Sequence, residues 1–263
     1  MSCKNVKTIF SYAALSLVLL ATGCQPRIRQ QARADRSKLP PVILWAWERP
    51  EDLEFLDPNR FGVAFLAQTL TLAGNEVTLT PRHQPLKIGP QTRVVAVTRI
   101  ESTKKTGRKA DLTKSQRDQL LRLIVRTLDL PNVSAIQVDF DVTVSEREFY
   151  RSLLDDLRRK LPNHVPLSMT ALASFCIGDR WLQDLPVDEA VPMMFRMGAD
   201  DQRIKSYLSK GNDFREPLCQ TSYGITLDEP LEMKFAESRR IYVFDDQAWT
   251  EKDVALLEER LRK

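Results

Sequence analysis

The hydrophobic pattern of the chain is dominated by short apolar runs, many of them rich in Val, Ile and Leu. Each run has the length of one β-strand and is apolar on both faces, as are the strands of buried parallel sheets. The predicted strands cover residues 42–47, 62–70, 76–80, 93–100, 135–141, 166–172, 190–197, 221–227 and 239–246. The stretch from 62 to 80 holds either one strand or two, so the sheet has about eight strands.

Helical periodicity separates several of these runs. Residues 113–128 place Leu120, Leu121, Ile124, Val125 and Leu128 on one face. Residues 145–161 form a second amphipathic helix with Phe149, Leu153, Leu154, Leu157 and Leu161 along its apolar stripe. Ser145 and Glu148 have the spacing of a capping box and predict the start of that helix. A third helical pattern covers residues 250–263.

Strands that alternate with helices indicate a parallel sheet covered by helices. About eight such strands predict the α/β fold class and a single (β/α)8 barrel of the TIM type over residues 42–263, because these barrels take about 250 residues. A doubly wound open sheet is the alternative. No G-x-G-x-x-G motif or P-loop follows a predicted strand, so the usual nucleotide sites are not indicated.

The N-terminus has the layout of a secretory signal. Lys4 and Lys7 precede an apolar run from Ile9 to Ala21, which ends in "ATGC" at residues 21–24. This ending resembles the bacterial lipobox, although Ala21 stands where Leu is usual. The resemblance implies a lipoprotein signal peptide at 1–23, a lipidated Cys24 and a membrane anchor of acyl chains such as palmitate. Gln25 replaces the Asp of inner-membrane retention signals, which favours the outer membrane facing the periplasm. An ordinary cleaved signal or an uncleaved anchor remains the alternative.

Residues 24–41 are polar and basic without periodicity, and we expect them to form a flexible tether. Removal of residues 1–23 leaves 37 basic and 35 acidic residues, so the remaining chain is nearly neutral. The basic residues form no block, and nucleic-acid binding is therefore not expected.

The run "AIQVDFD" at 135–141 carries two acidic residues on one side. Ile136, Val138 and Phe140 share one face, and Gln137, Asp139 and Asp141 share the other. In a barrel the apolar face packs on helices, so the polar face points into the lumen near the C-terminal mouth, where barrel active sites lie. A buried carboxylate needs a partner or a purpose, because burying it alone is costly.

Charged residues at other strand ends are candidate partners for these aspartates. They are Glu48 after Trp45 and Trp47, Arg99 and Glu101, Arg196, Asp228 and Glu229, and Asp245 or Asp246. A neutralised ion network of Asp139, Asp141, Arg99 and Arg196 at the rim, with no catalytic role, is the structural alternative.

Most of the region after residue 41 resembles an uncharacterised bacterial family, domain of unknown function 3142. The resemblance is carried by "VILWAWERPEDLEFL", "GVAFLA", "IQVDFD", "EFYRSLLDDLRRKLP", "LSMTALASFCIGDRWL", "LPVDEAVPMMFRMG" and "LDEP". That family has no assigned activity, so the resemblance bears on the fold more than on the function.

The strand at 135–141 is also distantly similar to the D-x-x-D-x-D-x-E strand of family 18 chitinase-like glycoside hydrolases. Ser134, Gln137, Asp139 and Asp141 fall on its four acidic positions, and only Asp139 matches. Asp141 stands where the family has its proton-donating Glu. "MMFR" at 193–196 lies where the family has Met-x-Tyr-Asp. The substrate-assisted mechanism of that family is therefore not expected here.

Another glycosidase arrangement remains open. Asp141 is a candidate general acid and Asp139 a neighbour that raises its pKa, because like charges close together do not both ionise easily. Trp45, Trp47 and Trp181 are candidates for stacking on sugar faces, and core packing is the alternative role. Arg196 is a candidate for holding an acidic sugar.

Other chemistries find less support. His83 and His164 are the only histidines and lie in no metal-ligand spacing, so neither a metal nor any other cofactor is expected. No G-x-S-x-G motif is present. Cys176 and Cys219 are predicted at opposite ends of the barrel, which argues against the disulfide that an oxidising compartment favours, and their pairing stays open.

Two functions remain. The first is an envelope lipoprotein with a glycoside-hydrolase-like barrel, whose catalytic candidates are Asp139 and Asp141 and whose candidate glycan-binding residues are Glu48, Trp47, Arg99, Arg196 and Asp228. The second is a non-catalytic glycan-binding or envelope-assembly lipoprotein. A carbohydrate and, through the lipid, a membrane are the expected partners in both.

Overall fold

The protein is a closed parallel barrel in which eight strands follow one another around the wall. The computed structural model describes residues 39–102, 108–229 and 233–262. The strands are β1 (Val42–Ala46), β3 (Phe61–Ala73), β6 (Val94–Ser102), β7 (Val133–Asp139), β8 (Leu167–Leu172), β9 (Glu189–Met193), β10 (Ser222–Thr226) and β11 (Arg240–Phe244). β1 pairs in parallel with both β3 and β11, and this closes the barrel. The predicted TIM-type architecture is confirmed, and the open-sheet alternative is wrong.

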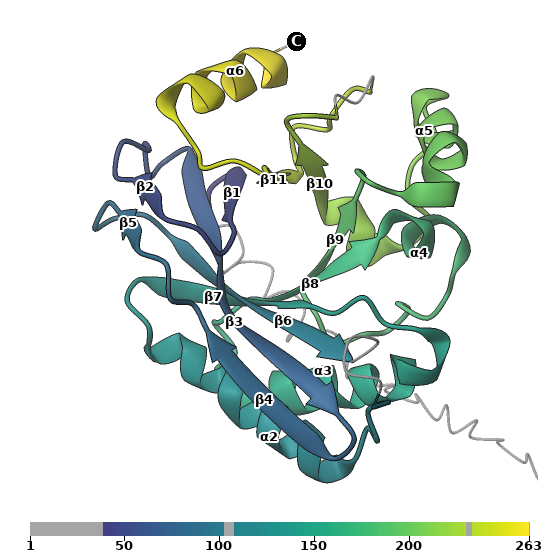
Figure 1. Cartoon of the computed structure of the whole chain (residues 1–263). Coiled ribbons are helices and arrows are strands. Elements are labelled where there is room, and N and C mark those ends of the chain that lie inside the picture. Colours follow the sequence, from purple (N-terminus) through teal and green to yellow (C-terminus); the bar gives the residue numbers. More distant parts are fainter. Residues whose placement is uncertain (1–38, 103–107, 230–232, 263) are drawn as a thin grey trace, which may run out of the picture.

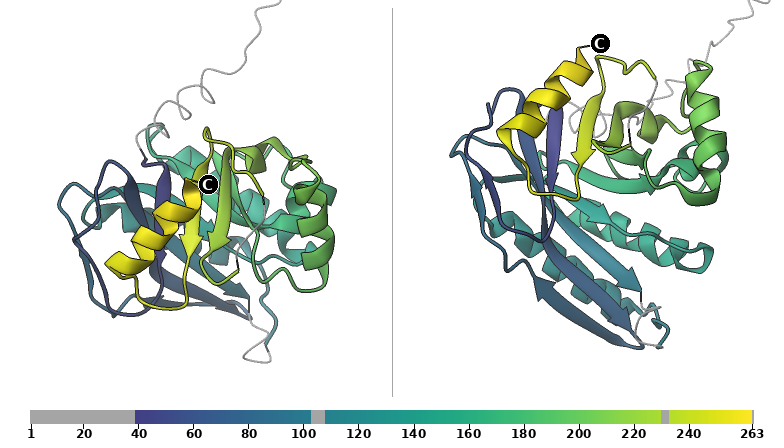
Figure 2. Two further views of the ribbon diagram at one scale, coloured as in Figure 1. Left: turned by 90° about the horizontal axis from the view of Figure 1, so that it is seen from above. Right: turned by 45° about the horizontal axis from the view of Figure 1, so that its top comes forward.

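The stretch from 62 to 80 forms two strands, of which only the first belongs to the barrel. β3 is longer than its neighbours, and its outer half, Gln68–Ala73, pairs antiparallel with β4 (Glu76–Pro81). β3, β4 and β6 consequently project beyond the rest of the barrel (Figures 1 and 2). A separate small sheet joins β2 (Glu51–Leu53) to β5 (Leu86–Ile88).

Helices cover the barrel unevenly. They are α2 (Lys114–Arg126), α3 (Arg147–Lys160), α4 (Ala173–Gly178), α5 (Asp201–Ser209) and α6 (Glu251–Leu261), with the short 3-10 helices η1 (Thr127–Asp129), η2 (Val144–Glu146), η3 (Gly198–Asp200) and η4 (Pro217–Thr221). The connections from β1 to β3 and from β3 to β6, which the structure describes fully, contain strands and turns in place of helices. The three predicted helices are confirmed as α2, α3 and α6.

The predicted cap of the second helix is wrong: α3 begins at Arg147, and the capping box lies at the 3-10 turn η2 that precedes it. The capping box consists of Thr143 and Glu146, whose carboxylate accepts hydrogen bonds from the Thr143 backbone N–H at 2.6 Å and hydroxyl at 2.7 Å. Ser145 lies inside the 3-10 turn that precedes α3, so it cannot cap that helix. The sequence contains two overlapping capping-box spacings, and the 3-10 turn decides between them.

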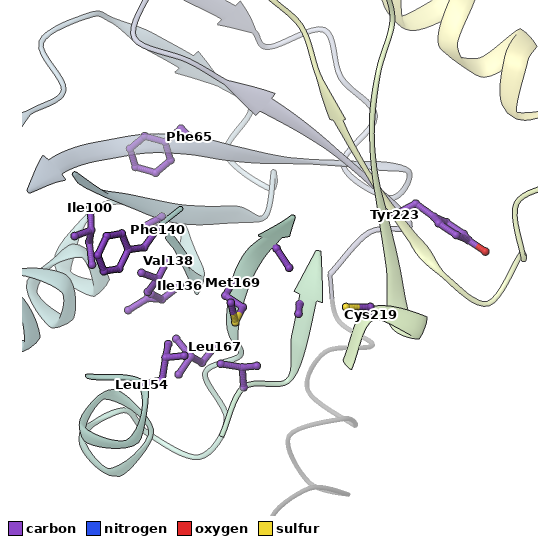
Figure 3. Close-up of a cluster of buried hydrophobic side chains, with 14 of the residues drawn as sticks. Phe65, Ile100, Ile136, Val138, Phe140, Leu154, Leu167, Met169, Cys219 and Tyr223 are labelled. Carbon is purple, nitrogen blue, oxygen red and sulfur yellow. The ribbon is translucent and has the colours of Figure 1, made fainter. Parts of the chain in front are cut away.

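Alternation along the strands divides the core into two layers. Outward residues such as Ile136 and Val138 pack with the apolar stripes of the helices, and Figure 3 shows them in one cluster with Leu154 and Leu167. Inward residues fill the lumen and form a second cluster of Leu39, Ile43, Trp45, Ala64, Val95, Val97, Ala135, Val191, Tyr242 and Phe244. This arrangement gives β7 the predicted apolar outer face and polar inner face.

Residues 39–41, predicted as the end of the tether, pack on the barrel. Leu39 is buried in the lumen cluster, and Arg240 donates hydrogen bonds to the carbonyl oxygens of Leu39 and Pro40. The Pro41 carbonyl accepts a hydrogen bond from the Ile241 backbone at 2.8 Å. This segment lies at the N-terminal ends of the strands, so the folded barrel includes Leu39. The signal peptide, Cys24 and the rest of the tether fall outside the described residues.

Cys176 and Cys219 form a disulfide with 5.8 Å between their Cα atoms. The predicted placement of the two cysteines at opposite ends of the barrel is wrong, because the chain that leads into β10 runs back along α4. The backbone N–H groups of Arg215 and Glu216 both donate to the Cys176 carbonyl oxygen, and this places η4 beside the helix. Both sulfur atoms belong to buried residues.

Candidate functional site

The inward positions at the C-terminal ends of the strands line a pocket of about 320 Å³ in the barrel mouth. Inward residues recur at every second position along a strand, and six of the eight barrel strands contribute lining residues at or just after their ends. The lining residues are Trp45 on β1 and Trp47 just after it, Arg99 on β6, Asp139 and Asp141 at β7, Thr170 on β8, Met193, Phe195 and Arg196 at β9, and Phe244, Asp245 and Asp246 at β11. The polar inner face predicted for β7 therefore opens into a pocket at the mouth.

Asp139 and Asp141 differ in exposure. Asp139 is 8% exposed and accepts a hydrogen bond from the Thr170 hydroxyl at 2.6 Å, whereas Asp141 is exposed at the pocket. Burial raises the pKa of Asp139, and the nearby charge of Asp141 raises it further. The hydrogen bond from Thr170 and the charge of Arg99 oppose this shift. The pair thus combines a buried carboxyl that holds its proton more tightly with an open carboxyl that a ligand can reach.

Arg99 lies near Asp139 without binding it closely. Its Nη1 is 3.8 Å from Asp139 Oδ2, while its Nε donates to Glu101 Oε1 at 3.1 Å. The guanidinium also lies over the Trp47 ring, 5.2 Å from the centroid. The predicted proximity of Arg99 and Asp139 is confirmed, but the main carboxylate partner of Arg99 is Glu101.

Arg196 is held at the rim by acidic residues. Its guanidinium pairs with Asp246 and lies 3.5 Å from Asp228 Oδ2, and its backbone N–H donates to Glu229. The backbone of Arg196 has a φ of 50°, which turns the chain sharply after β9. The hydrogen bond to Asp246 raises the pKa of Arg196. The hydrogen bond from Thr226 and the charge of Arg196 lower the pKa of Asp228.

Four aromatic rings form one wall of the pocket. Trp47 lies 4.5 Å from Trp45, Trp45 lies 4.9 Å from Phe244, and Phe244 lies 4.8 Å from Phe195, all measured between ring centroids. The prediction had included Trp45 and Trp47. The two phenylalanines come from other parts of the wall: Phe244 from β11, which pairs with β1, and Phe195 from the chain just after β9.

Two of the predicted glycan-binding residues lie outside the pocket lining. Glu48 turns away and accepts a hydrogen bond from the His83 backbone at 3.0 Å. Asp228 lies at the rim, where it pairs with Arg196. Trp181 is buried in the outer core against Tyr150 and Phe175, so its role there is packing.

A hydrogen-bonded frame holds the two loops that carry the aromatic and acidic lining. Arg49 donates to the carbonyl oxygens of Asp245 at 2.7 Å and Asp246 at 2.8 Å, and its Nε binds Glu51 at 2.9 Å. The Trp249 indole donates to the Trp45 carbonyl at 3.1 Å. These bonds tie the chain after β1 to the chain after β11 and fix the shape of that side of the mouth.

Thr170, Met193 and Phe244 were not singled out from the sequence. Thr170 is the hydrogen-bond donor to Asp139, and Met193 and Phe244 are inward residues of strand ends. Counting inward positions by twos along every predicted strand, starting from the polar side of β7, would have found them.

A scan of the chain against protein-family models finds no match, and no curated protein matches its sequence significantly. In the described part of the chain, no helix has the length and apolarity needed to cross a membrane. Over the same residues, no three or more His, Cys, Asp or Glu side chains are grouped so that they could hold a metal ion.

Proposed function

We propose that the chain is a glycan-active barrel of the glycoside-hydrolase type, with Asp139 and Asp141 as its catalytic carboxyl pair and the mouth pocket as the glycan site. The observation that carries the proposal is the contrast within this pair, one carboxyl buried with a raised pKa and the other exposed in the same pocket. Glycosidases need such a pair, because one group must donate a proton while the other acts as a base or nucleophile.

The chemistry assigned to the pair is hydrolysis of a glycosidic bond. Asp141 contacts the glycosidic oxygen, because it is the exposed member. The pair supplies one proton to that oxygen as its bond to the anomeric carbon breaks. A water molecule adds to the anomeric carbon, and its proton returns to the carboxylate pair. The aromatic wall supplies faces on which the apolar side of a sugar ring stacks.

The distant similarity of β7 to the acidic strand of family 18 glycoside hydrolases supports the same reaction class. Asp139 matches an acid of that strand, and Asp141 stands in place of the proton-donating Glu. The resemblance to domain of unknown function 3142 adds no activity of its own.

A non-catalytic glycan-binding protein is the second candidate. Both oxygens of Asp139 have neighbours, Thr170 at 2.6 Å and Arg99 at 3.8 Å, which is the arrangement of a structural ion network. The acids at Ser134 and Gln137 of the similar family are absent. In this case the pocket binds a glycan and releases it unchanged.

The two candidates differ in product release. The full chain, purified in detergent, is incubated with peptidoglycan fragments and soluble polysaccharides, and new reducing ends are counted. We expect release by the wild type and a loss of about 100-fold or more in Asp141→Asn, since general acid catalysis contributes about 10² to 10⁴ in rate. Asp129→Asn, an exposed change on η1, is the matched control. If the wild type binds the glycan but releases no new reducing ends, the second candidate is the one that remains.

We also propose that Cys24 carries the lipid of a bacterial envelope lipoprotein, anchored in the outer membrane and facing the periplasm. The described chain begins its fold at the N-terminal ends of the strands, opposite the mouth, so a lipid tether there leaves the pocket facing away from the membrane. Cys24→Ser is expected to move the protein from the membrane pellet to the soluble fraction after cell fractionation.

A further inference from the structure

The charge balance of the mouth pocket points to the class of sugar that it takes. Four carboxylates line it, those of Asp139, Asp141, Asp245 and Asp246, against the two guanidinium groups of Arg99 and Arg196. An excess of negative charge in a concave site attracts cations and repels anions.

Both arginines already form ion pairs with acidic side chains of the protein. Arg196 pairs with Asp246 and also lies near Asp228, which stands outside the lining. Arg99 donates to Glu101, which is likewise outside the lining. Each arginine therefore already has a carboxylate partner in the protein, with which the carboxylate of an acidic sugar would have to compete. The role suggested from the sequence for Arg196, binding of an acidic sugar, is not favoured.

Two of the carboxylates lack a cationic partner. Among the residues that the structure describes, neither Asp141 nor Asp245 forms an ion pair. The Asp245 carboxylate accepts a hydrogen bond from the Gln247 backbone at 2.8 Å, while Arg49 binds the Asp245 carbonyl oxygen, and Asp141 is exposed. They lie at the ends of β7 and β11, so they approach the pocket from different strands.

The aromatic wall adds a second, independent feature. Electron-rich ring faces attract cations within about 6 Å, Trp most strongly, and the Arg99 guanidinium already lies over the Trp47 ring in this way. The Trp45 indole Nε1 is in addition a buried donor without a hydrogen-bond partner in the described structure, in a residue that is 6% exposed and lines the pocket. A ligand with both a cationic group and hydroxyl oxygens suits such a surface.

From these features we infer that the pocket binds an amino sugar whose amine is free and protonated, as in a de-N-acetylated hexosamine polymer, with the ammonium held by the Asp245 carboxylate while Asp141 stays at the glycosidic oxygen. This inference rests on the proposed glycan function and adds its substrate class. A neutral N-acetylated sugar would leave the Asp245 carboxylate unpaired, and a uronic acid would face it with like charge.

The test is calorimetric titration of the full chain, in detergent, with three tetrasaccharides: glucosamine, N-acetylglucosamine and galacturonic acid. We expect the glucosamine tetramer to bind at least about tenfold more tightly than the N-acetylated one, a factor that corresponds to one ion pair of moderate strength. Asp245→Asn keeps the acceptor for Gln247 but loses the charge. It is expected to weaken only the glucosamine tetramer, while Asp129→Asn leaves all three affinities unchanged.

Each other outcome overturns the inference in a distinct way. Equal or tighter binding of the N-acetylated or the galacturonic tetramer would reject the cationic substrate class and leave the glycan function standing. Equal effects of Asp245→Asn and Asp129→Asn on the glucosamine tetramer would show attraction by net charge alone, without the proposed site. Absence of binding by all three tetramers would contradict both the substrate class and the proposed function.

Discussion

Asp139 ends β7 and Asp141 follows two positions later, and both line the mouth pocket. Asp139 is buried beside Thr170, while Asp141 is exposed beyond the end of the strand. Their common face could be predicted from the strand period. Which of the two is buried depends on where β7 ends relative to β8, and the spacing of residues alone does not contain that information.

The raised pKa of Asp139 predicts a pH dependence of stability. Its ordinary pKa is 3.8, and burial raises it in the native state, so above pH 3.8 the folded chain still holds a proton that the unfolded chain has lost. The contribution of Asp139 to the free energy of unfolding is therefore highest below pH 3.8 and falls as pH rises through the native pKa.

Asp139→Asn removes this titration. Relative to the wild type, the variant's free energy of unfolding is expected to increase with pH across that window and to become constant above it. Urea unfolding at a series of pH values measures the difference, with the exposed Asp129→Asn as control. A difference that stays flat, or that decreases with pH, would show that Asp139 is not held in a destabilising ionised state.

At the scale of single elements, the start of α3 offers a matched pair of substitutions. Thr143→Ala removes the hydroxyl of the observed capping box and is expected to lower the free energy of unfolding by about 1 kcal/mol. Ser145→Ala, at the predicted but unused cap, is expected to change it by less than about 0.5 kcal/mol. Urea titrations compare the two. Equal losses would indicate that Ser145 shares the capping role.

Loss of the disulfide between α4 and η4 is expected to lower the free energy of unfolding by more than loss of the cap does. The two cysteines are 43 residues apart, and the chain-entropy relation gives about 4 kcal/mol for closing a loop of that length. We expect the double variant Cys176→Ala, Cys219→Ala to unfold at lower denaturant concentration than the wild type. Adding a reductant should lower the stability of the wild type and leave the variant unchanged. Reductant-independent stability of the wild type would argue that the cysteines are unpaired.

The elements that could be predicted from the sequence are those with a clear periodic pattern of hydrophobic residues. The amphipathic helices α2 and α3 and the apolar barrel strands follow directly from it. β4 is mostly exposed and pairs antiparallel outside the barrel, yet its residues read as one more strand of the series. The cysteine pairing stays open at the level of sequence, because the path of the chain around α4 and α5 is a tertiary property.

At the scale of the whole molecule, barrel closure explains why the site assembles. Side chains from β1, β6, β7, β8, β9 and β11 meet at one mouth, because parallel strands all point their C-terminal ends to the same side. This meeting of Asp139, Arg99 and Trp47 could be predicted once a barrel was assumed. The ion-pair partner of each charged side chain could not be predicted, because Arg99 and Arg196 each lie near more than one acidic residue.

The measurement that tests the central claim most directly is a crystal structure of Asp141→Asn with a bound glucosamine tetramer. The account predicts a sugar ring against Trp45 and Trp47 in the mouth, with a glycosidic oxygen within hydrogen-bond distance of residue 141. Pockets also lie outside the mouth, for example one beside α4 and η4 lined by Asp179 and Arg215, and one at the N-terminal ends of the strands. Sugar density in either of those, with the mouth filled only by water, would contradict the account.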